Sequence, residues 1–184
     1  ICVLAASLLS LQVPFLPVHL LFINLVTDSL PAIAIGMERS TKDILKEKPR
    51  DPSVGILTPA TMKQLGIQGI LIAIVTMSAY FLGLKESWAI ATTMAFSTLC
   101  LSRLFHGFNC RSQRSLYRIG LFTNKYSILA FVIGFCFLNA ILLWQPLHSL
   151  FSVTTITMMQ LFTIYALALI PTALIQLGRM LRHR

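Results

Sequence analysis

The chain has 184 residues, of which 56% are hydrophobic and only 11% are charged, and its mean hydropathy is +0.78. A soluble domain of this size carries roughly a quarter charged residues, so the composition excludes an ordinary soluble domain and indicates a membrane protein. The formal net charge of +9 does not indicate nucleic-acid binding, because the basic residues lie between apolar runs of membrane-spanning length.

Six apolar runs follow one another along the chain. Crossing a hydrocarbon layer of ~30 Å takes ~20 residues in a helix, and all runs but the first reach about that length. The first run is interpreted as the outer half of a helix, which suggests a fragment of a longer protein. We predict one all-α domain over residues 1–184, a polytopic transmembrane helix bundle with five full helices and a truncated first one. The predicted helices cover about 1–13, 18–36, 64–84, 88–108, 126–144 and 153–178.

The basic residues predict the orientation of the bundle. Of the 15 Lys and Arg residues, six lie in the loop 37–63, four in the loop 109–125 and three at the C-terminus. Only Lys85 lies in a loop of the opposite side, and Arg103 lies inside an apolar run. Because loops rich in Lys and Arg stay in the cytoplasm, both long loops and the C-terminus are predicted to be cytoplasmic.

Asp28 is the only acidic residue inside an apolar run. A carboxylate near the bilayer centre costs about 3 kcal/mol, which favours a functional role. In an α-helix, Asn24, Thr27 and Asp28 would share one face. They offer amide, hydroxyl and carboxylate oxygens, which suit Ca²⁺ or another hard cation. Pro31 leaves the Thr27 carbonyl without its helical donor, a feature tolerated at membrane depth where backbone lines a site. A polar contact between helices is the alternative interpretation.

Three segments carry a resemblance to a known family. FLPVHLLFINLVTDSLPAIAIGME (15–38) resembles the sixth transmembrane helix of P-type Ca²⁺-transporting ATPases. ILKEKPRDP (44–52) is similar to the cytoplasmic loop after that helix, which touches the phosphorylation domain of the family. LSRLFHGFNCRS (101–112) resembles the inner part of the eighth helix in bacterial members. The resemblance extends over essentially the whole chain, from a partial fifth helix to a generic ninth and tenth.

The resemblance implies a function that the residues alone do not give. In the family the NxxTD face supplies cation ligands, which here would be Asn24, Thr27 and Asp28. It implies an ATP-driven pump for Ca²⁺ efflux in a bacterial plasma membrane, with Mn²⁺ as an alternative ion and proton counter-transport left open. Mg²⁺-ATP would bind the missing N-terminal part, which holds the first four helices and the actuator, phosphorylation and nucleotide domains. The expected partners are that part and the lipid bilayer. No catalytic residue is expected here, so the chain alone should not hydrolyse ATP.

Two departures from the family pattern bear on the ion site. The fifth-helix Glu ligand would fall just before Ile1 and is missing, as is the fourth helix. Pumps that carry two Ca²⁺ ions have a Glu in the eighth helix where this chain has Arg103. An Arg there would repel a second Ca²⁺, so one ion per cycle is implied, with Arg103 modulating the site from within reach of Asp28. Alternatively, Arg103 snorkels to the inner interface, about 9 Å away at helical rise.

Two other functions explain less of the sequence than the pump does. A secondary transporter or channel could use Asp28 as its ion or proton site, but it would not need the long basic loop 37–63. A purely structural membrane domain would not explain a carboxylate inside an apolar run.

Overall fold

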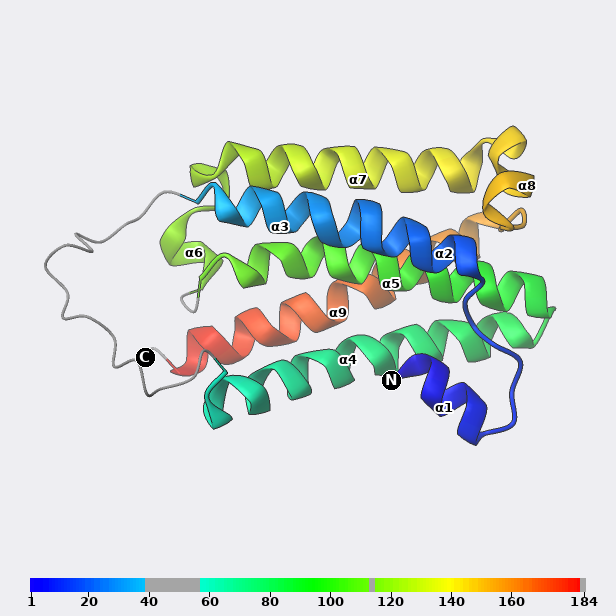
Figure 1. Ribbon diagram of the computed structural model, residues 1–184, viewed down its shortest axis with the longest axis horizontal. Coiled ribbons are helices and arrows are strands. Elements are labelled where there is room, and N and C mark those ends of the chain that lie inside the picture. The colour runs from blue at the N-terminus through cyan, green and yellow to red at the C-terminus, as the bar shows by residue number, and fades with distance from the viewer. Residues whose placement is uncertain (39–56, 113–114, 183–184) are drawn as a thin grey trace, which may run out of the picture.

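The structure, a computed structural model, describes residues 1–38, 57–112 and 115–182, and it contains no β-strand within these ranges (Figure 1). In chain order the elements are α1 (Cys2–Leu8), α2 (Pro17–Phe22), the π-helix η1 (Ile23–Asp28), α3 (Ser29–Gly36), α4 (Pro59–Leu84), α5 (Trp88–Cys110), α6 (Leu116–Ile119), the 3-10 helix η3 (Leu121–Thr123), α7 (Lys125–Leu143), the 3-10 helix η4 (Gln145–Leu147), α8 (His148–Phe151) and α9 (Met158–Arg182).

Five helices in the described ranges are long and apolar enough to cross a membrane. The first of them, Pro17–Gly36, is the continuous helix formed by α2, η1 and α3. The start of α4, the ends of α3, α5 and α9, and the start of α7 lie at the same end of the bundle (Figure 1). The prediction of an all-α transmembrane bundle with five full helices and a shorter first one is therefore confirmed. The protein is an integral membrane protein.

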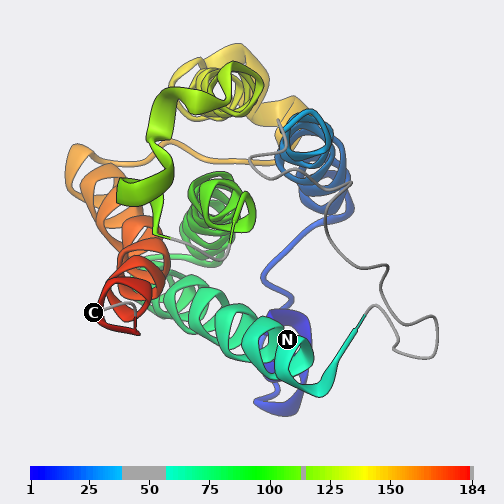
Figure 2. The same ribbon diagram turned by 90° about the vertical axis from the view of Figure 1, so that its left-hand side faces the viewer.

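The central helix of the bundle is α5. Viewed end-on, it is surrounded by α4, α9, α7 and the helix formed by α2, η1 and α3 (Figure 2). Two thirds of its membrane window is buried, against a third or less for each of the other spanning helices. Many of its buried residues are small, among them Ala91, Ala95 and Ser97. Small side chains allow neighbouring helices to approach closely, so α5 can contact partners on all sides.

Three predicted boundaries differ from the observed ones by five residues each. The helix predicted to begin at residue 64 begins at Pro59, because Thr58 caps it and accepts a hydrogen bond of 3.3 Å from the Thr61 amide. Lys63, assigned to the preceding loop, therefore lies in α4. The last helix begins at Met158 rather than at residue 153, and the first ends at Leu8 rather than at residue 13. The five other basic residues of the loop 37–63 lie outside the described residues.

Candidate cation site

The predicted ligand helix is not α-helical where the ligands lie. Its residues Ile23–Asp28 form the π-helix η1, between α2 and α3. The amide of Ser29 donates to the carbonyl of Asn24, five residues earlier, and the Ser29 hydroxyl donates to the same oxygen at 2.8 Å. Pro31 follows and has no N–H to donate. Single π-helical turns often occur at functional sites, and this one widens the backbone at the polar residues.

The wider turn corrects the prediction that Asn24, Thr27 and Asp28 share one helix face. A π-helix needs more than four residues for one turn, so Thr27 is turned away from Asn24, whereas Asp28 stays on the same side as Asn24. Thr27 is buried, and its hydroxyl donates to the Ile23 carbonyl at 2.8 Å. Asn24 is exposed and Asp28 is half-buried. The three residues are adjacent but do not form a single face.

Arg103 reaches the Asp28 carboxylate from α5. Its Nη1 lies 2.7 Å from Oδ2 of Asp28, and the two side chains are 38% and 40% exposed. The expected contact is therefore present, and the guanidinium is directed at the carboxylate rather than along a snorkelling path. A charge inside a membrane is costly unless it is paired, and here the carboxylate and the guanidinium are paired with each other. How Arg103 affects the number of bound ions stays a prediction.

A cavity of about 340 Å³ opens beside the ion pair. Its two polar linings are Asn24 and Arg103, which connect it to the Asp28 carboxylate. The remaining lining residues come from α1 and its N-cap, from the segment before α2, and from α2, η1, α4 and α5: Ile1, Cys2, Val3, Phe15, Leu20, Ile23, Gly69, Ile72, Ala73 and Leu99. A cation in this cavity would meet the amide oxygen of Asn24 on the wall, whereas Asp28 does not line the cavity and is reached past Arg103. Since Ca²⁺ takes six to eight oxygen ligands, this chain forms part of a site and not a complete one.

Metal ligands of other kinds do not gather elsewhere in the described ranges. Within residues 1–38, 57–112 and 115–182, no three His, Cys, Asp or Glu side chains lie close enough to hold an ion.

A second ion pair, which the sequence analysis did not find, lies at the membrane edge after α3. Glu38 accepts two hydrogen bonds from Arg111, of 2.9 Å from Nε and 2.8 Å from Nη2. Asn124 donates to the same carboxylate at 2.6 Å. The hydrogen bonds from Arg111 are the main cause that lowers the pKa of Glu38; partial burial opposes them and the bond from Asn124 adds to them. Arg111 had been counted only as a loop charge. The one feature of the sequence that could have indicated this pair is the position of Glu38 directly after the ligand helix.

Comparison with known proteins agrees with this architecture. Residues 12–181 match the family described as "Cation transporting ATPase, C-terminus". The chain is 35% identical over 175 residues to a calcium-transporting ATPase of Bacillus subtilis, which covers 94% of this chain and 20% of that protein. It is 42% identical over 136 residues to a calcium-transporting ATPase of Listeria monocytogenes, covering 73% of this chain and 16% of that protein. It is 32% identical over 185 residues to calcium-transporting ATPase 1 of Bacillus cereus, covering 90% of this chain and 21% of that protein.

These matches cover most of the chain but only about a fifth of each relative, so the chain spans about a fifth of the length of the curated relatives it matches. The family match extends over nearly the whole sequence and includes η1, Asp28 and Arg103. The chain belongs to the cation-transporting ATPase C-terminal family.

Proposed function

We propose that this chain is the ion-binding part of the membrane domain of an ATP-driven Ca²⁺ pump. The observation that carries the proposal is the contact of 2.7 Å between Asp28 and Arg103, which lie in two spanning helices beside a cavity that Asn24 also lines. A carboxylate at this depth is expensive to retain, and its partner is half-exposed to the cavity and can be exchanged. The calcium-transporting relatives support Ca²⁺ as the ion, with Mn²⁺ as an alternative because it uses the same oxygen ligands.

Each proposed ligand has an oxygen that remains available. The Asp28 carboxylate has a second oxygen beyond the one that Arg103 contacts. The Asn24 side chain is exposed on the cavity wall. The Thr27 hydroxyl donates its hydrogen to the Ile23 carbonyl and keeps the lone pairs of its oxygen, but the side chain is buried and turned away from Asn24, so Thr27 would become a ligand only when the π-helical turn rearranges. The remaining ligands would come from helices of the longer protein, since the chain spans about a fifth of its relatives.

Arg103 gives the site its proposed stoichiometry. The guanidinium of Arg103 is paired with Asp28, and a cation must displace it before it can bind the carboxylate. After displacement, the guanidinium remains in the cavity as a positive charge. A second divalent cation would then be repelled at short range, so the pump carries one ion per cycle. Whether the displaced charge is linked to proton counter-transport stays open.

The other steps of the cycle belong to partners of this chain. Phosphorylation and the binding of Mg²⁺-ATP take place in the N-terminal part of the pump, with its first four helices and its actuator, phosphorylation and nucleotide domains. The chain alone is inactive in ATP hydrolysis. The bacterial relatives support a plasma membrane location, with loops 37–63 and 109–125 and the C-terminus in the cytoplasm. A secondary transporter or channel is not favoured, because the family match covers residues 12–181.

The test is ATP-dependent ⁴⁵Ca²⁺ uptake by inside-out vesicles that contain the full-length protein. Asp28→Asn removes the charge and keeps the shape, and it should lower uptake by about 100-fold, the effect of losing about 3 kcal/mol of charge-assisted ligation. Glu86→Gln is the matched control, because Glu86 is an exposed carboxylate in the α4–α5 turn, and it should leave uptake unchanged. Wild-type uptake in Asp28→Asn would overturn the proposal.

A second pair of variants tests the hydroxyl. Thr27→Ala removes a proposed ligand, and Thr163→Ala removes a hydroxyl with the same bond to its own helix, 2.8 Å to the Met159 carbonyl, on the exposed face of α9. Only Thr27→Ala should raise the Ca²⁺ concentration for half-maximal uptake. Equal effects of both variants would exclude Thr27 as a ligand. Competition by MnCl₂ in the same vesicles would show whether Mn²⁺ is also carried.

A further inference from the structure

Two ion pairs join the same two helices at different depths. Asp28 and Arg103 form the first, and Glu38 and Arg111 form the second. The two arginines are eight residues apart on α5 and its C-cap, about 12 Å at helical rise. The two acids are ten residues apart, with Asp28 in the ligand helix and Glu38 just after the C-cap of α3. Because residues four and eight apart lie on one face of an α-helix, α5 presents both arginines to the ligand helix.

The two pairs differ in how firmly they are held. The Arg103 side chain is 38% exposed and lies against the large cavity, whereas the Arg111 side chain is fully buried. Arg111 binds Glu38 through two nitrogens, donates to the Leu121 carbonyl at 3.0 Å, and donates to the Thr123 hydroxyl at 2.6 Å. Such forked, charge-assisted bonds are geometrically demanding. The Glu38–Arg111 pair is therefore a fixed joint, and the Asp28–Arg103 pair is the exchangeable one.

The same joint includes α7. Asn124 is the N-cap of α7. Its side-chain Nδ2 donates to Glu38 at 2.6 Å and to the Ala34 carbonyl at 3.0 Å, and its side-chain Oδ1 accepts from the Ser127 amide at 3.1 Å. The end of α3 is thus bound to α5 and α7 at one point.

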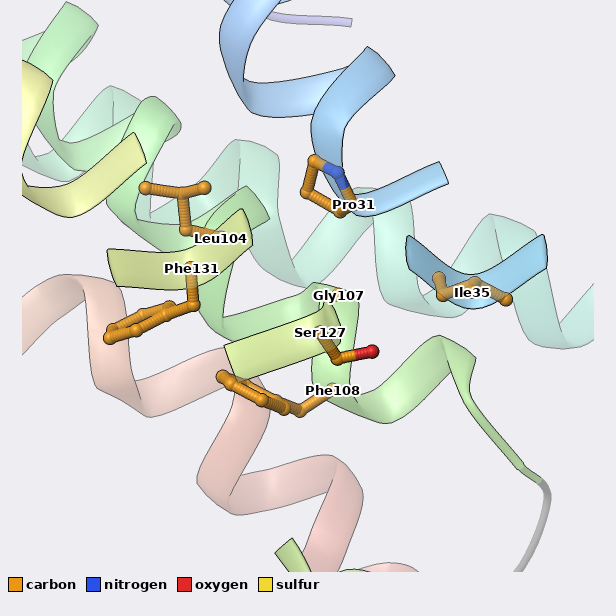
Figure 3. Close-up of a pocket in the computed structure, with 7 residues that line it drawn as sticks. All are labelled: Pro31, Ile35, Leu104, Gly107, Phe108, Ser127 and Phe131. Atoms are coloured by element: carbon orange, nitrogen blue, oxygen red, sulfur yellow. The ribbon is translucent and has the colours of Figure 1, made fainter. Parts of the chain in front are cut away.

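Between the two ion pairs the helices are in direct contact. Gly107 lies midway between Arg103 and Arg111, and a Cβ atom at this glycine would meet Cβ of Pro31 at 3.3 Å. Figure 3 shows Pro31 and Ile35 of α3 facing Leu104, Gly107 and Phe108 of α5 and Ser127 and Phe131 of α7, around a cavity of about 10 Å³. That volume is about the size of one water molecule, so little space remains for Pro31 to shift.

We propose that the Glu38–Arg111 pair and the Gly107–Pro31 contact are positioning elements that hold Asp28 in register with Arg103. This inference rests on the proposed function, in which a cation must displace Arg103 from Asp28. A well-aligned guanidinium competes strongly for the carboxylate, because charge-assisted hydrogen bonds weaken as their geometry departs from the optimum. The joint therefore keeps the apparent affinity for the cation low, which favours release after transport. Glu38, Arg111 and Gly107 act through Asp28 and Arg103 and do not contact the ion.

The inference predicts that loosening the joint makes cation binding tighter. In the full-length protein, Glu38→Gln, Arg111→Lys and Gly107→Ala should each lower the Ca²⁺ concentration for half-saturation by about threefold, a typical coupling between contacting residues. Equilibrium ⁴⁵Ca²⁺ binding measures this without ATP. Damage to the fold has no reason to increase affinity, so the direction of the change separates positioning from a merely structural role.

A double-mutant cycle tests whether Glu38 and Gly107 act on Ca²⁺ affinity through Arg103. Arg103→Gln removes the competing charge and should itself lower the half-saturating Ca²⁺ concentration, and adding Glu38→Gln or Gly107→Ala should then cause no further change. Arg179→Gln is the matched control, because Arg179 joins the cytoplasmic ends of α9 and α5 through the Asn109 and Ser112 carbonyls and does not touch the ligand helix. It should not lower the half-saturating concentration.

The outcomes separate the two proposals. The proposed function requires that the wild-type protein binds Ca²⁺ saturably and that Asp28→Asn abolishes this binding. If either result is absent, the proposed function fails. If that binding is present but Glu38→Gln and Gly107→Ala leave the affinity unchanged or weaken it, the positioning role is overturned. A threefold gain that persists undiminished in the Arg103→Gln background also overturns it. Should Arg111→Lys fail to fold, the other two variants decide.

Discussion

Gly83 of α4 lies directly against the backbone of Ala91 in α5: a Cβ atom at Gly83 would stand 2.5 Å from the Ala91 Cα and 2.7 Å from its nitrogen. These are backbone atoms, which cannot move aside as a flexible side chain can. The contact joins α4 and α5 next to the turn between them, with Gly83 before the turn and Ala91 after it. It depends on glycine having no side chain.

Gly83→Ala should therefore lower the free energy of unfolding of the full-length protein by about 1–3 kcal/mol, the usual cost of overpacking. Gly66→Ala is the matched control in the same helix, because no described atom lies within 4 Å of a Cβ there. It should be neutral or stabilising by up to about 1 kcal/mol, since alanine favours helix. Thermal unfolding in detergent measures both variants. Equal melting temperatures for the two would contradict the close α4–α5 contact.

The orientation of the bundle predicts accessibility from opposite sides. Lys85 lies exposed in the α4–α5 turn, and Tyr117, 88% exposed, lies in α6 at the other end. In a cysteine-free background, Lys85→Cys should react with a membrane-impermeant maleimide only from the extracytoplasmic side, and Tyr117→Cys only from the cytoplasmic side. Lys46→Cys, outside the described residues, should follow Tyr117→Cys. Labelling of Lys85→Cys and Tyr117→Cys from the same side would exclude this topology.

The Glu38–Arg111 pair should give stability a defined dependence on pH. The pKa of Glu38 is lowered from 4.5, mainly by the hydrogen bonds from Arg111. A carboxyl group whose pKa is lower in the folded than in the unfolded state stabilises the folded state at pH values above its ordinary pKa. This stabilisation is lost as the pH falls through the pKa of the folded state. At neutral pH, Glu38→Gln should therefore cost about 1–3 kcal/mol, typical of hydrogen bonds to charged groups.

Below pH 4.5 the melting temperature of the wild type should fall toward that of Glu38→Gln, while the two should keep a constant difference above it. The melting temperature of the double variant Glu38→Gln/Arg111→Gln should not change relative to that of Glu38→Gln over this pH range, because neither variant contains the Glu38 carboxylate. If the melting temperatures of the wild type and Glu38→Gln differ by the same amount throughout the acidic range, the stabilising effect of Glu38 does not depend on its ionised form.

The sequence predicted the spanning helices well because a hydrophobic run of fixed length has few alternatives in a bilayer. It also identified Asp28, because an acid inside an apolar run is rare. The face shared by Asn24, Thr27 and Asp28 was wrong, because the prediction assumed an α-helical repeat through η1. A π-helical turn is a local response of the backbone, and neither Pro31 nor the polar spacing predicts it uniquely.

The Glu38–Arg111 pair was missed for a different reason. Charges at the ends of apolar runs are usually solvated, and counting them gives orientation but not pairing. The two residues are 73 positions apart, and only the packing of α3 against α5 brings them together. Arg103 differed, since a basic residue inside an apolar run must find a partner, and the only acid in any run was Asp28.

The strongest consequence of the Asp28–Arg103 pair concerns ion number. In the full-length protein, Arg103→Glu replaces the cation 2.7 Å from Asp28 by a second carboxylate at the edge of the same cavity. Two carboxylates attract divalent cations and repel each other, so this variant should bind a second Ca²⁺ or acquire a steeper dependence of transport on pH. Arg103→Lys keeps the charge but loses the planar fork, so it should retain one ion with a modest change in affinity. Equilibrium ⁴⁵Ca²⁺ binding per phosphorylatable site gives the stoichiometry, and uptake across a pH series gives the profile. If Arg103 served only to anchor α5, both variants would lower the melting temperature and leave one ion and the wild-type pH profile, and that result in Arg103→Glu would defeat the assignment of Arg103 to the second ion's place.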